Sequence, residues 1–232
     1  MIVVPLGAAI RRWLAVVCGA ALLVGVIRWG LGHETEPGGT APVGVLRAVT
    51  VRSDAIALTF PVPRGTHGVT ATLAALAKAP ATFFVGSHYA HRHPGHLRQL
   101  LRAGQEVEVL APTAHTPVCT AVRPLEAVGA QPTFLQLRGS LLPPPGLRRA
   151  AQRCGLRPVA WSSTVTVATA IGATPMTARP GDILRLPVDA AVADSLPSLL
   201  RTLRTRGYTP LTLEALVALA QGGATIGSHG LA

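Results

Sequence analysis

Charged and aromatic residues are scarce in this sequence of 232 residues. Asp, Glu, Lys and Arg together make up 13% of it, and Phe, Trp and Tyr only 4%. A hydrophobic share of 49% with so few charges excludes an intrinsically disordered chain, because disordered chains lack the apolar surface to form a core. With few aromatic rings available, Ala, Val and Leu must fill most of the core of what we expect to be one domain with an appendage.

Lysine is almost absent, since Lys78 is the only one among 21 basic residues. The formal net charge of +11 therefore comes from arginines, which are scattered, with no run longer than a pair. Aromatic residues are not interleaved with them as a nucleic-acid stacking platform requires. We therefore expect no nucleic-acid partner, while a basic outer face near an anionic polymer or lipid stays open as an alternative.

Cysteine is also rare, with three residues and no Cys-x-x-Cys or zinc-finger spacing. Cys18 lies in an apolar N-terminal segment. Cys119 and Cys154 lie in the main part of the chain and would be able to pair if that part is exported to an oxidising compartment. We expect two separate buried thiols, with a Cys119–Cys154 disulfide as the alternative.

The N-terminal segment carries a membrane signal. Arg11 and Arg12 precede an uncharged apolar run of about 15 residues that ends at Ile27, short of the roughly 20 that span a bilayer. Arg28 and Trp29 could extend the run to the interface. The paired arginines place their end in the cytoplasm. The rest of the chain then lies outside, whether the run is an uncleaved anchor, which we favour because no cleavage site follows it, or a signal peptide.

Beyond this segment, short β-rich stretches alternate with helical ones, which indicates a parallel α/β fold, although the pattern alone does not distinguish an open sheet from a barrel. Strands are expected at 48–60 (a strand pair), 81–85, 107–110, 133–137, 158–162, 182–186 and 209–211. Helices are expected at 69–79, 94–103, near Leu125, and at 147–154, 195–206 and 213–220. The predicted divisions are a cytoplasmic N-terminus (1–12), a transmembrane anchor or signal sequence (13–30), a linker (31–45), a folded domain (46–220) and a tail (221–232).

Four segments of the domain follow the motif order of a known family. They are IALTF at 56–60, the run from Thr72 to Val107 that contains Ala-Thr-Phe-Phe-Val-Gly, PGDILRL at 180–186, and the Arg-Gly-Tyr segment at 196–216. Together they resemble the polysaccharide deacetylase family, the NodB homology domain, over roughly residues 50 to 220. The resemblance implies a distorted (β/α) barrel behind an N-terminal membrane helix. It also implies that in active members one Asp and two His hold a zinc-like metal that activates water against an acetamide or acetyl ester, while a second Asp acts as base.

The resemblance also identifies the parts of that machinery that are missing here. The family's Asp-Asp pair is replaced by Pro61 and Val62, neither of which can coordinate a metal or accept a proton. The positions of the two metal-binding histidines hold Leu110 and Ala114, and His115 lies one residue late. A single histidine makes a poor metal site.

The remaining motifs are degenerate as well. Leu135 stands where the family has the arginine that orients the base, and Arg138 lies at a variable position. Trp161 keeps the family's tryptophan, but the acid after it is missing. The last motif ends in Leu-Pro at Pro187 instead of Leu-His, with Asp189 two residues later. We therefore predict that the zinc site is lost, that no cofactor binds, and that the family mechanism does not operate.

Three hypotheses on function follow. The first is a membrane-anchored, extracytoplasmic and catalytically inactive deacetylase-like protein that binds a polysaccharide, a peptidoglycan glycan or a cell-envelope partner. Its old cleft would be lined by Pro61, Val62, Leu110, His115, Leu135, Trp161 and Pro187. The second is a working deacetylase with a relocated site at His115, Asp189 and Arg138. The third is a structural envelope protein without a ligand. The sequence does not predict an oligomeric state.

Two other clusters of polar residues are weaker candidates for a functional site. Glu106 and Glu108 alternate on a predicted strand, so both carboxylates point to one face, which we expect to be solvated. Four histidines lie close together in SHYAHRHPGH, at 88, 91, 93 and 96. A metal site is one explanation for them, and a solvated helix start is the one that we expect.

Overall fold

The computed structural model describes residues 44–64, 67–170, 172 and 177–225. The chain divides into two compact units, and the second, Val43–Ala232, contains all of these residues. Within these ranges, no helix has the length and apolar character needed to cross a membrane. The predicted anchor at 13–30, the cytoplasmic N-terminus, most of the linker and most of the tail lie outside the described residues.

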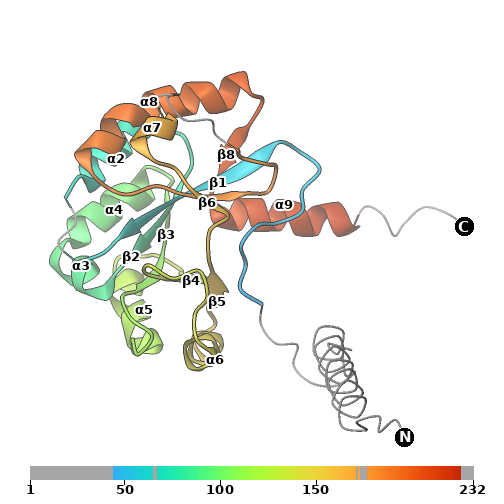
Figure 1. Ribbon diagram of the computed structural model, residues 1–232. Helices are drawn as coiled ribbons and strands as arrows, with labels where there is room; N and C mark the ends of the chain where they lie inside the picture. The colour runs from blue at the N-terminus through green and yellow to red at the C-terminus, as the bar shows by residue number, and fades with distance from the viewer. Residues whose placement is uncertain (1–43, 65–66, 171, 173–176, 226–232) are drawn as a thin grey trace, which may run out of the picture. The chain divides into compact units, whose positions relative to one another are not determined.

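A curled parallel sheet forms the centre of the domain (Figure 1). Its strands follow the order β5-β4-β3-β2-β1-β7-β6, and β8 pairs with the first residues of β1. The strand bounds are β1 Ala55–Val62, β2 Thr82–Val85, β3 Glu106–Ala111, β4 Phe134–Leu137, β5 Arg157–Val159, β6 Ser163–Thr164, β7 Ile183–Arg185 and β8 Thr209–Leu211. Every pairing between these strands is parallel, as the alternation of strands and helices predicts.

The sheet is a half-barrel rather than a closed one, because its last strands, β5 and β6, do not pair with each other. A segment before β1 lies across this opening: Leu46 pairs with Val159, and Ala48 pairs with Asp182. Gly181 lets this segment approach, since it has φ +83° and a Cβ there would collide with the carbonyl oxygen of Val49. The strand pair expected at 48–60 is thus a β-bridge followed by β1.

The helices cover both faces of the sheet. Their bounds are α2 Val69–Leu76, α3 Ser87–Arg92, α4 Pro94–Arg102, α5 Val118–Glu126, α6 Pro145–Arg153, α7 Val167–Ala170, α8 Ala190–Thr205 and α9 Leu213–Thr225. Side chains alternate along β1, so Ile56 and Leu58 pack outward under the helices α2 and α8, whereas Ala55 and Ala57 face the concave side. On that side they pack with Leu213 and other residues of α9, which lies apart from α2, α4 and α8 (Figure 1).

A disulfide joins Cys119 of α5 to Cys154, the residue after α6. The Cα atoms lie 5.3 Å apart, within the range that a disulfide requires. The expectation of two separate thiols was therefore wrong. It failed because α5 and α6 lie side by side on the same face of the sheet, which a sequence separation of 35 residues does not reveal.

Candidate functional site

The carboxyl ends of the strands are the place where parallel α/β folds bind ligands. The strand register identifies the side chains that point to the concave side there. Gln136 of β4 pairs with Leu110 of β3 and Val159 of β5, both of which belong to the concave core. Two residues further along β4 and β5, Arg138 and Trp161 follow on the same side by alternation. Arg185 of β7 completes the group.

Arg185 is the most unusual side chain in this group. Its Cζ lies 4.7 Å from the centroid of the Trp161 ring, which is a cation–π contact. Its Nε atom is buried and has no hydrogen-bond partner within the described part of the chain. Burial, and then the charge of Arg138, lower the pKa of the Arg185 guanidinium from its ordinary value. An arginine nevertheless keeps its charge at neutral pH, so this end of the sheet carries two positive charges.

Gln136 is the second unusual residue. Its side chain is fully buried, and neither its amide nitrogen nor its amide oxygen has a partner among the described residues. An amide buried in this way costs stability, typically about 1–3 kcal/mol. The concave end of the sheet therefore contains a hydrogen-bonding group that the fold itself does not use.

These residues do not fit a zinc ion. A hydrolytic zinc site needs about three nitrogen, oxygen or sulfur ligands and an open position for water. Among the described residues, no group of three or more His, Cys, Asp or Glu could hold a metal ion. The side chains that occupy the concave end include Pro61, Arg138 and Arg185, and two guanidinium groups repel a divalent cation. We therefore derive no step through a metal.

The structure separates the predicted cleft residues into two groups. Pro61 and Leu110 are buried on the concave side, and Trp161 and Pro187 are partly exposed at the strand ends. Val62 and Leu135 belong instead to the core between the sheet and its outer helices, where each is fully buried. Side chains alternate along a strand, and Val62 and Leu135 are next to Pro61 and Gln136, which point to the concave side. Val62 and Leu135 therefore point to the outer side of the sheet.

The candidates for a relocated site have other roles or none that the structure reveals. Asp189 is the N-cap of α8, and its Oδ1 accepts a hydrogen bond of 2.8 Å from the Val192 backbone N–H. His115 is exposed in the turn between β3 and α5. Arg138 is exposed and lies close enough to Arg185 to lower its pKa.

Sequence reasoning missed Arg185 and Gln136. The signal for both was present, because each is a polar residue inside a very short, otherwise apolar strand: FLQL for β4 and ILR for β7. A long polar side chain in a central strand needs a partner or a ligand. Comparison with the family's motifs directed attention to the positions of the metal ligands, the base and the arginine that orients it, and Arg185 and Gln136 occupy none of these.

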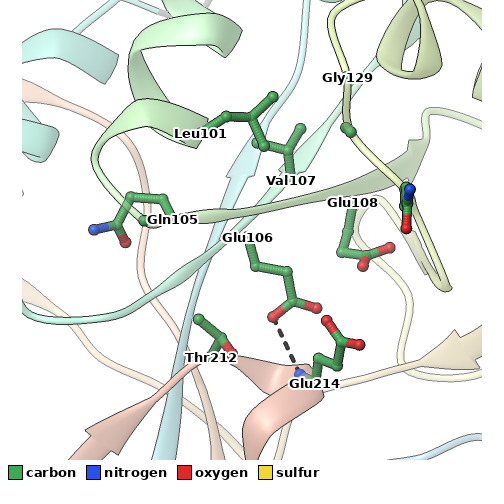
Figure 2. A pocket seen from close by; sticks show the side chains of 11 residues that line it. Leu101, Gln105, Glu106, Val107, Glu108, Gly129, Thr212 and Glu214 are labelled. Atoms are coloured by element: carbon green, nitrogen blue, oxygen red, sulfur yellow. Dashed lines mark hydrogen bonds between the residues drawn. The ribbon is translucent and has the colours of Figure 1, made fainter.

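At the opposite end of the sheet, the amino ends of the strands border a cavity of about 400 Å³ (Figure 2). Glu106 and Glu108 of β3 line it, together with Glu214 of α9. Glu108 is 1% exposed, so the expectation that both carboxylates are solvated was wrong. That face of β3 is covered by the start of α9, which strand periodicity alone does not show.

Hydrogen bonds explain why these carboxyls are buried. Glu106 Oε2 accepts bonds from the Thr82 hydroxyl at 2.7 Å and the Glu214 backbone N–H at 3.1 Å, which caps α9 (Figure 2). Glu108 Oε2 accepts bonds from the backbone N–H groups of Thr133 and Phe134 and so fixes the start of β4. Both carboxyls therefore hold neighbouring elements in place.

The two carboxyls interact electrostatically, and we expect Glu108 to carry a proton that it shares with Glu106. Burial, and then the charge of Glu106, raise the pKa of Glu108 to about 10, while burial raises the pKa of Glu106. Glu106 Oε1 has no other donor among the described residues. A protonated Glu108 that donates to Glu106 satisfies this atom and avoids two adjacent buried charges.

Replacing Glu108 by glutamine is expected to stabilise the protein increasingly as the pH rises. The unfolded chain loses the Glu108 proton near its ordinary pKa, whereas the folded protein retains it up to about pH 10. The wild type therefore loses stability with rising pH between these limits, and the neutral Glu108→Gln variant does not. Thermal unfolding should show little difference at about pH 4 and a gain on the order of 2 kcal/mol at about pH 9.

The matched control for this measurement is Glu126→Gln, at an exposed position on α5. Its stability relative to the wild type should not change with pH. If the free energy of unfolding of Glu108→Gln differs from that of the wild type by the same amount at both pH values, the proposal that Glu108 keeps its proton is wrong.

The histidine cluster is a helix start, as expected. His93 and His96 stack with their ring centroids 5.1 Å apart, and the Tyr89 hydroxyl bonds to Nδ1 of His96 at 2.8 Å. His91 and His93 are exposed. None of these rings belongs to a metal-binding group within the described part of the chain.

Comparison with known proteins defines the fold more closely than the sequence can. No sequence-family model matches the chain, and no curated protein sequence matches it. Its fold, however, matches the polysaccharide deacetylases of carbohydrate esterase family 4 in solved structures. At the identities given below, this similarity confirms the expected fold, while the chemistry has to be argued from the residues.

Three solved structures illustrate the match. BA3943, a CE4 family pseudoenzyme from Bacillus anthracis, has a TM-score of 0.64 at 16% identity, covering 75% of this chain and 69% of that one. A family 4 carbohydrate esterase from Bacillus anthracis has a TM-score of 0.62 at 21% identity, with coverage of 81% and 96%. PdaA of Bacillus subtilis, also a family 4 carbohydrate esterase, has a TM-score of 0.62 at 18% identity, with coverage of 80% and 92%.

Proposed function

We propose that this chain is a catalytically inactive relative of the family 4 carbohydrate esterases that binds a glycan of the cell envelope. The observation that carries the proposal is the composition of the concave end of the sheet. Positions that would have to supply carboxylates and imidazoles are occupied by Pro61, Leu110 and Pro187. These residues cannot bind a metal or accept a proton, so neither the activated water nor the base of a deacetylase is available.

Two further observations support the proposal. BA3943 is a pseudoenzyme on the same fold, and a mutant of it has restored enzymatic activity, so this fold persists after catalysis is lost. The Cys119–Cys154 disulfide is typical of proteins in oxidising compartments outside the cytoplasm. An anchor at 13–30 would tether the domain there, next to the envelope polymers that it is proposed to bind.

Binding of soluble fragments of peptidoglycan and of chitin oligosaccharides to the full chain tests this function. We expect binding with a Kd in the micromolar to millimolar range, which is about −8 to −4 kcal/mol. Trp161→Ala should weaken it about tenfold, because Trp161 is the large aromatic side chain at the strand ends. Trp161→Phe is the matched control and should retain most of the affinity. Thermal unfolding of both variants separates lost binding from lost folding.

Absence of binding to every glycan tested, with a folded wild-type chain, would favour a structural envelope protein. Release of acetate from an acetylated oligosaccharide would favour a relocated active site.

A further inference from the structure

We propose that the concave end of the sheet binds an oxyanion carried by a sugar ring, held by Arg185 and Arg138 together with the amide of Gln136. The proposal rests on the glycan-binding function given above and adds the charge of the ligand to it. The ligand class is a saccharide with a carboxylate or phosphate substituent.

Unbalanced positive charge is the first argument. Arg185 of β7 and Arg138, directly after β4, are both directed to the concave side by the strand register, and no carboxylate of the described residues pairs with either of them. Their mutual repulsion is one cause of the lowered pKa of Arg185. An oxyanion between the two guanidinium groups would relieve this repulsion and would satisfy the buried Nε of Arg185. The planar donor fork of arginine suits carboxylate and phosphate equally well.

The unpaired amide of Gln136 is the second, independent argument. It is fully buried, both of its polar atoms lack partners within the described residues, and its strand register directs it to the concave side. A leucine at this position would serve the fold better, since Leu110 and Val159 are its neighbours across the sheet. The amide N–H is a donor suited to an oxyanion oxygen.

Trp161 is a positioning residue in this arrangement. Its ring lies 4.7 Å from Cζ of Arg185, and stacking of this kind restricts the plane of the guanidinium. A donor fork that is already oriented loses less side-chain entropy when an anion binds.

The test measures binding of four probes to the full chain: N-acetylglucosamine 1-phosphate, a glucuronate-containing disaccharide, neutral di-N-acetylchitobiose, and inorganic phosphate. The two anionic sugars should bind at least about tenfold more tightly than the neutral one. Arg185→Gln should weaken binding of the anionic sugars about 10- to 100-fold and leave the neutral sugar nearly unaffected. Arg138→Gln should have a smaller effect in the same direction, because this side chain is exposed.

Two further variants make the result specific. Arg201→Gln removes one positive charge from an exposed residue in the second half of α8, a helix that packs on the outer face of the sheet, and should not change any affinity. Gln136→Leu should raise the unfolding temperature by a few degrees, because it removes a buried unpaired amide, and at the same time weaken binding of the anionic sugars about tenfold. Higher stability with unchanged affinity would show that Gln136 takes no part in binding.

The outcomes of this test distinguish failure of the oxyanion site from failure of the proposed glycan binding. Equal affinity for neutral and anionic sugars, with no effect of Arg185→Gln, would overturn the oxyanion site and leave glycan binding standing. Binding of inorganic phosphate as tight as that of the sugar phosphate would overturn the saccharide part of the ligand. Failure of all four probes to bind would overturn both proposals. The relative affinities of the two anionic sugars tell carboxylate from phosphate.

Discussion

Replacing both Cys119 and Cys154 by serine is expected to lower the free energy of unfolding by about 3–4 kcal/mol. The disulfide closes a loop with a sequence separation of 35 residues, and the loss of chain entropy in the unfolded state predicts a value of this size. Cys119 is exposed and Cys154 is only partly buried, so serine leaves no cavity and the effect reports the cross-link itself. The unfolding temperature should fall by about 10 °C.

Reduction of the wild type should reproduce this loss, and a reducing agent should have no effect on the double variant. Cys18→Ser is the control for thiol chemistry elsewhere in the chain and should unfold as the wild type does. Three free thiols in the unfolded, unreduced wild type would contradict the disulfide.

Much of the fold follows from the sequence because local pattern and packing agree. The stretch Ala-Thr-Phe-Phe-Val contains β2, and its consecutive residues Phe83 and Phe84 lie in the outer and concave cores respectively. The predicted strand at 209–211 has the observed bounds of β8. Short apolar strands between amphipathic helices leave few arrangements other than a parallel sheet covered by helices.

The start of α8 is an element boundary that the local sequence pattern did not predict correctly. A helix was expected from Ser195, but α8 begins at Ala190, because Asp189 caps it through the Val192 N–H. Pro197 therefore lies inside the helix, where it is exposed, rather than in its first turn, where proline is usually found. The sequence also offers this carboxylate as part of a relocated site. An aspartate can serve as a helix cap or as an acid, and the contact that the structure shows is that of a cap.

The candidate site was less predictable than the fold. The proposed loss of the metal ligands rests on single positions, such as Pro61, that the family resemblance points out in the sequence. The contact of Arg185 with Trp161 depends on the pairing of β7 with β6, which begins two residues after Trp161. The burial of Glu108 depends on α9, which lies more than a hundred residues later in the chain. Contacts of this kind are set by tertiary packing, which sequence periodicity does not contain.

The largest functional effect that we expect is the absence of deacetylation. Compared with a family 4 carbohydrate esterase that releases acetate in the same assay, acetate release should be lower by about 10⁴-fold or more, because the proposed function provides neither metal-activated water nor a general base. Arg185 adds a further obstacle, since its positive charge lies on the concave side where a divalent cation would need negative ligands. Supplying zinc should not restore activity.

Zinc content is the most direct test of this account. The full chain, equilibrated with zinc and then dialysed against metal-free buffer, should retain less than about 0.1 equivalent, because the residues that the structure describes offer no group of three metal donors. Retention of one equivalent of zinc, lost when His115 or Asp189 is replaced by alanine and accompanied by acetate release, would contradict the account.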